Sequence, residues 1–185
     1  MEEIEEMTAS IGVIGSGTWG TALAVLLAAK GHQVTIWSAI EKEVESLSKE
    51  RSHPNLPGVT ISDTILITGD LGTAMGEKDL LVSAVPSIFV RPTAAKMKAF
   101  LKPGQVIVNV AKGIEETTLM TLSQVIEDEI TGADVAVLSG PSHAEEVSRG
   151  LPTTCVAGAR SKKTAEWVQD VFMNEVFRVY TSPDV

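Results

Sequence analysis

The stretch that decides the fold is a short apolar run, Ile11-Gly-Val-Ile14, followed at once by Gly15-Ser16-Gly17-Thr18-Trp19-Gly20. A strand-like run, a G-x-G-x-x-G segment and a helical pattern behind it are the signature of a dinucleotide-binding βαβ unit. Gly15 would make the tight turn, Gly17 would let the backbone approach a pyrophosphate, and Gly20 would let the helix pack closely on the sheet. The helix N-terminus would present free N–H groups to the anion. We therefore expect this segment to bind the pyrophosphate of NAD or NADP.

Outward from this unit, short β-branched runs alternate with segments of helical period, which favours a parallel sheet covered on both faces. The expected strands are Ile11 to Ile14, Val34 to Trp37, Ile65 to Ile67, Leu80 to Ala84, Val106 to Val110, Val135 to Leu138, Thr154 to Ala157 and Phe177 to Tyr180. The expected helices are Thr18 to Lys30, Glu41 to Glu50, Phe89 to Leu101, Leu119 to Ile130, Ala144 to Arg149 and Lys162 to Met173. We predict an α/β fold with a Rossmann-like, doubly wound, mostly parallel sheet.

Length and composition are those of one globular domain. The chain has 185 residues, of which 44% are hydrophobic and 21% charged, enough to bury a core without disulfides or metal. Residues 1–9 read as an acidic leader because four glutamates fall there, and residues 10–185 read as the dinucleotide-binding domain. The single cysteine, Cys155, cannot form an internal bridge, which fits a reducing compartment.

The charge pattern excludes several classes of partner. A net charge of −9, without clustered Lys or Arg, argues against nucleic acid. The uncharged stretch Thr8 to Ala29 contains four glycines and follows an acidic segment, so neither a membrane span nor a signal peptide is expected. His32, His53 and His143 show no metal-ligand spacing, so no metal site is expected.

The end of the second strand leaves the choice of cofactor open. NAD-selective folds place an acid about 20 residues after the glycine motif, where it holds a ribose hydroxyl. This chain has Trp37-Ser38-Ala39-Ile40 there; the first carboxylate is Glu41, slightly late, and no arginine stands nearby. Ser38 could form a hydrogen bond with either NAD or NADP.

Two further strand ends supply candidate ligand groups, because sites in open α/β sheets form beyond the carboxyl ends of the strands. After the fourth strand, Ser87 could cap the next helix, and Phe89 is either a cofactor-packing or a core aromatic. After the fifth strand stands Lys112, followed by Gly113. Its compact charge suits a phosphate or a polarised carbonyl, and the neighbouring glycine allows close approach.

The sixth strand runs into Ser139-Gly140-Pro141-Ser142-His143-Ala144-Glu145. Ser142 with Glu145 three residues later forms a capping-box pattern, and a helix start of this kind also accepts an anion, so both roles stay open for Ser142. A Ser142–His143 nucleophile lacks an orienting acid. His32 follows a helix-ending glycine and is expected at the surface, whereas Cys155 should pack as a small apolar residue.

Taken together, several segments resemble the NAD(P)-dependent glycerol-3-phosphate dehydrogenases of the soluble bacterial type. The resemblance runs from about Ser10 to the end and is carried by Gly15 to Ala24, Val85-Pro-Ser-x-Phe89, Lys112-Gly-Ile-Glu115, Leu138 to Val147 with Gly150-x-Pro-Thr153, and Phe177-Arg-Val-Tyr180. It implies a cytoplasmic enzyme that interconverts dihydroxyacetone phosphate and sn-glycerol 3-phosphate by hydride transfer, for phospholipid synthesis. The implied cofactor contacts are Gly15, Ser16, Gly17, Thr18, Trp19, Gly20, Ser38, Phe89, Lys112 and Ala144, and the implied substrate contacts are Lys112, Gly140 and Ser142.

Two departures from the family pattern matter. Ala39 stands where bacterial members often carry an arginine near the adenosine ribose, which weakens any expectation of NADP preference. The family's general acid/base lysine belongs to a helical second domain that follows a segment like Thr181-Ser-Pro-Asp-Val185, so no catalytic acid is expected within residues 1–185, and a homodimer would form through that second domain. The alternatives are a related β-hydroxyacid or ketopantoate-type reductase domain and a non-catalytic NAD(H)-binding module.

Overall fold

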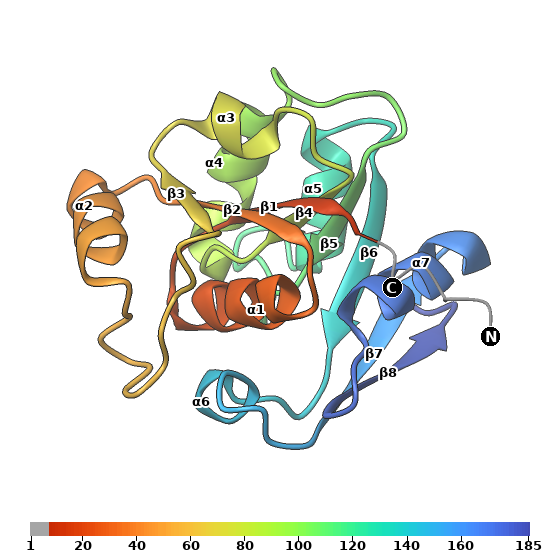
Figure 1. The fold of residues 1–185 in the computed structure, drawn as a ribbon. Helices are drawn as coiled ribbons and strands as arrows, with labels where there is room; N and C mark the ends of the chain where they lie inside the picture. Colours follow the sequence, from red (N-terminus) through yellow and green to blue (C-terminus); the bar gives the residue numbers. More distant parts are fainter. Residues whose placement is uncertain (1–7) are drawn as a thin grey trace.

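The structure of this chain, a computed structural model, describes residues 8–185 and confirms the Rossmann-like α/β fold (Figure 1). Its strands are β1 (Ser10–Ile14), β2 (Gln33–Trp37), β3 (Leu66–Thr68), β4 (Leu80–Ser83), β5 (Val106–Asn109), β6 (Asp134–Ser139), β7 (Thr153–Ala159) and β8 (Phe177–Ser182). Its helices are α1 (Thr18–Ala29), α2 (Glu41–Glu50), α3 (Leu71–Met75), α4 (Ser87–Met97), α5 (Leu122–Glu129), α6 (Ala144–Val147) and α7 (Lys162–Phe172).

The strand order of the sheet, β3-β2-β1-β4-β5-β6-β7-β8, places the reversal of winding between β1 and β4. The chain moves outward from β1 through β2 to β3 and then crosses back to β4 on the other side of β1. Loops that leave two such neighbouring strands in opposite directions open a crevice at the carboxyl edge of the sheet. Here those loops begin at Gly15 and Ala84.

The pairing of β6 with β7 is antiparallel, whereas all other neighbouring strands of the described sheet run parallel. The short helix α6 joins β6 to β7 at one edge of the sheet, so β7 starts where β6 ends and must run back beside it. The connection from β7 to β8 through α7 restores the parallel direction.

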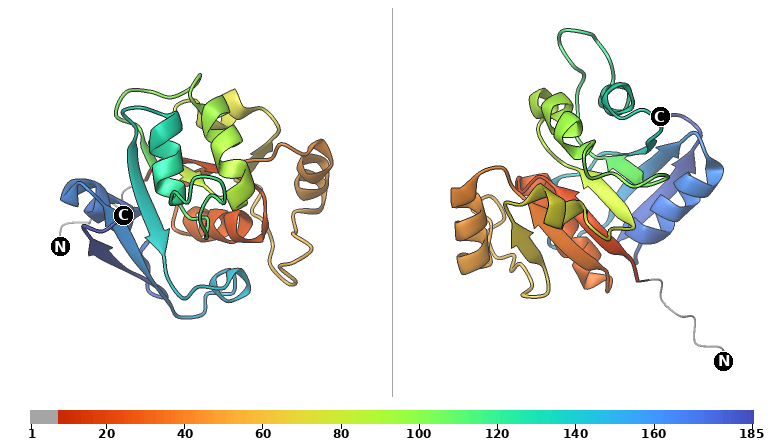
Figure 2. Two further views of the ribbon diagram at one scale, coloured as in Figure 1. Left: turned by 180° about the vertical axis from the view of Figure 1, so that it is seen from behind. Right: turned by 90° about the horizontal axis from the view of Figure 1, so that it is seen from above.

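The core lies on both faces of the sheet because alternate residues of each central strand point to opposite sides. On β4, Leu80 and Val82 join one buried cluster with residues of α1 and α7, while Leu81 joins a second cluster with residues of α3, α4 and α5. Figure 2 shows α4 and α5 side by side on this second face. The continuous apolarity of the strand sequences is thus explained by burial on both sides.

Several element boundaries differ from those predicted. The prediction missed α3, whose five residues begin after Asp70, the side chain of which accepts a hydrogen bond from the Thr73 N–H at 2.6 Å. The predicted start of the fourth helix at Leu119 is wrong, because Leu119 has a φ of 60° and lies 72% exposed in a turn. Ser87 does not cap α4: it is the first helical residue, and Pro86 occupies the N-cap position.

The expected surface position of His32 is also wrong. Its side chain is buried, with Nδ1 accepting a hydrogen bond from the Ala9 N–H at 3.1 Å and Nε2 lying 3.0 Å from the Val171 carbonyl oxygen. Ala9, placed in the acidic leader by the sequence, is buried in the core as well; residues 1–7 of that leader lie outside the described residues. Within residues 8–185, no helix is long and apolar enough to cross a membrane.

Candidate functional site

The loop between β1 and α1 is built on two glycines that the surrounding backbone requires. Gly15 has a φ of 127°, and a Cβ there would lie 2.7 Å from the carbonyl carbon of Ala84. At Gly20, a Cβ would lie 2.2 Å from the carbonyl oxygen of Gly15. These glycines let α1 start directly against the end of β1 and beside the end of β4.

The middle glycine of the motif, Gly17, is different. Its φ of −62° and ψ of 174° are accessible to other residues, and nothing lies within 4 Å of where its Cβ would stand. It is the N-cap residue of α1, a twelve-residue helix with no acidic side chain in its first turn. Neither the fold nor the backbone conformation requires glycine here, so the open space in front of Gly17 is available to a ligand at the helix N-terminus.

A cleft opens in front of Gly17 at the carboxyl edge of the sheet, and we call it the switch-point cleft. The loops after β1, β4 and β5 and the start of α6 line it together. Its lining residues are Gly17, Thr18, Trp19, Ala84, Val85, Pro86, Ser87, Val110, Ala111, Lys112, Ser142, His143 and Ala144. The segments after β4, β5 and β6 that the sequence singled out therefore meet at one cleft, whereas Ser38, at the end of β2, is not among its lining residues.

Lys112 is exposed at the mouth of this cleft, and its Nζ lies 3.4 Å from the carbonyl oxygen of Ser142. A second hollow beyond β5 and β6 is lined by Lys112, Ser139, Gly140 and Asn109, among others. Asn109 could not be singled out from the sequence, because it lies inside an otherwise apolar strand. Its amide is buried, and its Oδ1 accepts no hydrogen bond within the described residues, which makes it a candidate acceptor for a ligand group beside Lys112.

The segment after β6 has a structural role that the sequence did not reveal. A Cβ on Gly140 would lie 2.5 Å from the Thr154 carbonyl oxygen, so glycine is required there for packing against β7.

The predicted capping box is wrong: His143 is the N-cap of α6, without a side-chain cap, and the Ser142 Oγ instead lies 3.3 Å from the Gly140 carbonyl oxygen. Burial raises the pKa of the Cys155 thiol, which packs beneath this segment as the expected small apolar residue.

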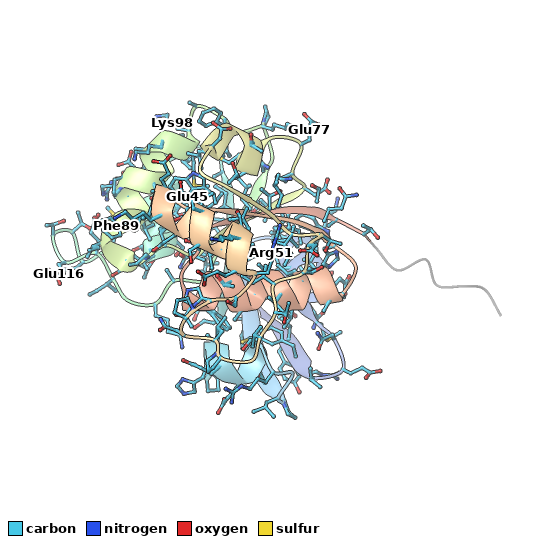
Figure 3. The ribbon with its side chains drawn as sticks, turned by 60° about the vertical axis from the view of Figure 1, so that its left-hand side comes forward. Glu45, Arg51, Glu77, Phe89, Lys98 and Glu116 are labelled. Atoms are coloured by element: carbon cyan, nitrogen blue, oxygen red, sulfur yellow. The ribbon has the colours of Figure 1, made fainter. Side chains whose placement is uncertain are left out.

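The two aromatic candidates lie in different surroundings. Trp19 lines the switch-point cleft, and its buried Nε1 donates no hydrogen bond within residues 8–185. Phe89 is 52% exposed on α4 and does not line that cleft; Figure 3 shows it at the surface. Phe89 is therefore not a core aromatic, and the alternative of cofactor packing stays a prediction.

A third hollow lies on the other side of Gly17, between the glycine loop, α2 and the loop that follows α2, and we call it the α2 cleft. It is lined by Ser16, Gly17, Thr18, Lys42, Glu43, Ser46, Leu47, His53, Pro54 and Asn55. Glu43 Oε2 accepts hydrogen bonds from the Ser16 Oγ at 2.6 Å and from the Ser38 Oγ at 2.7 Å. These bonds lower the pKa of the Glu43 carboxyl group, so it is ionised at neutral pH. Glu43 could not be singled out from the sequence, because only the tertiary fold brings it to both serines.

No group of three or more His, Cys, Asp or Glu side chains in the described part of the chain could hold a metal ion. The polar side chains that line the three hollows are instead hydroxyls, amides, two imidazoles, two lysines and one carboxylate. Such groups can bind a dinucleotide and a phosphorylated substrate.

Comparison with known proteins gives a consistent result. The family described as NAD-dependent glycerol-3-phosphate dehydrogenase N-terminus matches residues 10–165. A glycerol-3-phosphate dehydrogenase [NAD(P)+] from Agathobacter rectalis is 62% identical over 176 residues, covering 95% of this chain and 52% of its own length. One from Fusobacterium nucleatum is 51% identical over 178 residues, covering 95% and 53%. The chain thus spans about half the length of the curated relatives it matches.

Solved structures agree with the sequence comparison. The crystal structure of a glycerol-3-phosphate dehydrogenase from Coxiella burnetii superimposes with a TM-score of 0.91 at 28% identity, covering 96% of this chain and 55% of that one. A UDP-D-ManNAc dehydrogenase from Pyrococcus horikoshii superimposes with a TM-score of 0.78 at 13% identity, covering 95% and 47%, and shows the shared fold alone.

Proposed function

The chain belongs to the family of NAD-dependent glycerol-3-phosphate dehydrogenase N-terminal domains, and from this premise we propose that it binds the cofactor of such an enzyme. The whole protein would interconvert dihydroxyacetone phosphate and sn-glycerol 3-phosphate. The nicotinamide would supply or accept the hydride, and the residues described here would hold it in place.

The observation that carries the proposal is the contrast among the three glycines of the loop. Packing explains Gly15 and Gly20, whereas Gly17 faces open space with a φ that any residue could adopt. A glycine kept free of neighbours at the N-terminus of α1 fits the approach of a pyrophosphate to the backbone. Ser16, Thr18 and Trp19 would flank the cofactor on the same loop, and Ala144 would contact it across the switch-point cleft.

For the substrate, we assign Lys112, Gly140 and Ser142. The Lys112 ammonium group stands between the switch-point cleft and the hollow lined by Gly140, so it can reach both a cofactor and a substrate phosphate or carbonyl. Gly140 also has the packing role described above, so its part in substrate binding would come from its backbone groups. The Phe89 ring and the Ser38 hydroxyl complete the proposed cofactor contacts.

We further propose that the proton donor for the C2 oxygen lies in the half of the relatives that this chain does not span. A cytoplasmic location, a role in phospholipid precursor synthesis and a homodimer belong to the same proposal. A net charge of −9 without basic clusters supports a small-molecule substrate rather than nucleic acid.

The test joins this chain to the remaining half of the Agathobacter rectalis relative and follows NADH and NADPH oxidation with dihydroxyacetone phosphate. The joined protein should turn over, whereas residues 1–185 alone should be slower by at least ~10²-fold, the order that general acid catalysis contributes. Turnover with a ketopantoate-type or β-keto acid substrate instead would support the related reductases. Activity of residues 1–185 alone at the rate of the joined protein would place the proton donor within this chain.

A further inference from the structure

The α2 cleft contains a carboxylate that the proposed hydride transfer does not use. Glu43 lies in the first turn of α2, yet its side chain reaches back to the glycine loop and to the end of β2. Both serines that donate to it are buried, with 4% exposure each. Two fixed donors therefore hold one oxygen of the carboxylate at the junction of β1, β2 and α1.

This junction lies next to Gly17, which lines both the α2 cleft and the switch-point cleft. If the pyrophosphate lies at Gly17 and the nicotinamide enters the switch-point cleft toward Lys112, the adenosine half must extend into the α2 cleft. In dinucleotide-binding sheets, a carboxylate near the end of the second strand accepts a hydrogen bond from the adenosine ribose. Here no acid stands at the strand end, but Glu43 occupies the equivalent space from α2.

We propose that Glu43 makes this chain select NAD(H) over NADP(H), an inference that rests on the proposed cofactor-binding function. The carboxylate can accept a hydrogen bond from a 2′-hydroxyl through Oε1, which accepts none from residues 8–185. A 2′-phosphate would instead bring a second anion against a fixed negative charge. Ser16 and Ser38 give their hydroxyl hydrogens to Glu43, so these two hydroxyls can accept a hydrogen bond from a ribose but cannot donate one to that phosphate.

The other charged groups of the α2 cleft do not reverse this preference. Burial lowers the pKa of His53, which favours its neutral form and weakens any attraction for a phosphate. Lys42 is the single lysine or arginine among the lining residues. Lys42 and Glu43 are both exposed on α2, but only Glu43 is held in place, by the hydrogen bonds from Ser16 and Ser38. No arginine lines this cleft, so the planar donor that typically binds a 2′-phosphate is missing from the described lining.

The experiment measures Kd for NADH and NADPH on the 185-residue chain and on two variants by calorimetry at pH 7.5. Glu43→Gln removes the proposed negative charge. Glu45→Gln removes the same charge from an exposed position on the same helix, outside the α2 cleft (Figure 3). We expect the unmodified chain and Glu45→Gln to bind NADH at least ~10-fold more tightly than NADPH, the order of one unfavourable charge contact.

In Glu43→Gln this ratio should fall by at least ~10-fold, mainly because NADPH binds more tightly. The same comparison with AMP and adenosine 2′,5′-bisphosphate should reproduce the change, because these probes differ only at the ribose. An unchanged ratio in Glu43→Gln, or tighter NADPH than NADH binding by the unmodified chain, would overturn the inference while leaving the proposed function intact. Failure of the folded chain to bind either dinucleotide would overturn the proposed function, and this inference with it.

Discussion

The guanidinium group of Arg91 meets the carboxylate of Glu115 edge to edge, with Nε 2.7 Å from Oε1 and Nη2 2.8 Å from Oε2. Arg91 Nη1 also donates to Asp128 and Glu129 on α5, at 2.7 and 2.8 Å. Glu115 stands three residues after Lys112, so this paired contact fastens the segment that carries the proposed substrate lysine to both α4 and α5. Bidentate pairs of this kind fix geometry as well as charge.

The Arg91–Glu115 pair predicts a defined acid dependence of stability. Its hydrogen bonds with Arg91 lower the pKa of Glu115 from 4.5 to about 2, so the folded state favours the ionised form. The stabilisation is complete above pH 4.5 and is lost as the pH falls toward 2. Glu115→Gln should therefore lower Tm at pH 7, and the difference in Tm from the unmodified chain should shrink below pH 4.5. Glu116→Gln, at the exposed neighbouring position labelled in Figure 3, is the control and should leave Tm nearly unchanged.

His32 predicts a second pH effect at higher pH. Burial lowers its pKa from 6.5, and its Nδ1 accepts the Ala9 N–H, a bond that only the unprotonated nitrogen can make. The unfolded chain therefore binds more protons below pH 6.5, and the free energy of unfolding should decrease as the pH falls from 7.5 to 5.5. Urea denaturation should show a smaller decrease for His32→Gln than for the unmodified chain. Equal decreases in both proteins would contradict the prediction, and His143→Gln, at an exposed histidine, serves as the control.

Gly20 should be intolerant of any side chain for reasons of packing alone. A Cβ there lies 2.2 Å from the Gly15 carbonyl oxygen, so Gly20→Ala must push α1 away from the end of β1. We expect a loss of ~1–3 kcal/mol or more in the free energy of unfolding. The Cβ of Gly17→Ala would meet nothing within 4 Å, so this variant should keep nearly the same free energy of unfolding as the unmodified chain. Chemical denaturation gives the free energy of unfolding of both variants. Equal values would contradict the prediction, because they would show that the glycine loop shifts to accept the Gly20→Ala Cβ without cost.

Lys112 should matter for turnover and not for folding. It is exposed, and its hydrogen bond in the described chain is the 3.4 Å contact of Nζ with the Ser142 carbonyl oxygen. In the two-domain protein, Lys112→Ala should lower kcat/KM by at least ~10²-fold, the order seen when one charged donor is lost from an active site. Lys112→Arg should rescue poorly, because a planar guanidinium cannot replace a compact ammonium between two ligands. Near-normal kinetics with a much lower Tm would instead make Lys112 a structural residue.

Local sequence patterns were sufficient for the parts of the fold that depend on neighbouring residues. The apolar run before Gly15 and the helical period after Gly17 predict β1, the glycine loop and α1, because each is set within a few residues. The continuous apolarity of strands such as Val106–Asn109 also predicts their burial on both faces.

The predictions failed where contacts distant in the sequence decide the structure. His32 is buried because it bridges Ala9 and Val171, 23 and 139 residues away, and no local pattern records this. Leu119 has the spacing of a helical apolar stripe, yet the pairing of Ile114 with Thr121 turns the chain there and leaves Leu119 in solvent. The role proposed for Glu43 could not be predicted from the sequence either, because it depends on where Ser16 and Ser38 lie in the folded chain.

The measurement that tests the central claim most directly is calorimetric titration of the chain and of Gly17→Val with NADH. The Gly17→Val variant should remain folded, because a φ of −62° is accessible to valine and no atom lies within 4 Å of the position of its Cβ. Its methyl groups would fill the space assigned to the pyrophosphate, so we predict that the unmodified chain binds NADH and that the folded variant shows no measurable binding. Equal affinity for NADH in the unmodified chain and in a Gly17→Val variant of unchanged Tm would contradict the assignment of the glycine loop as the pyrophosphate site.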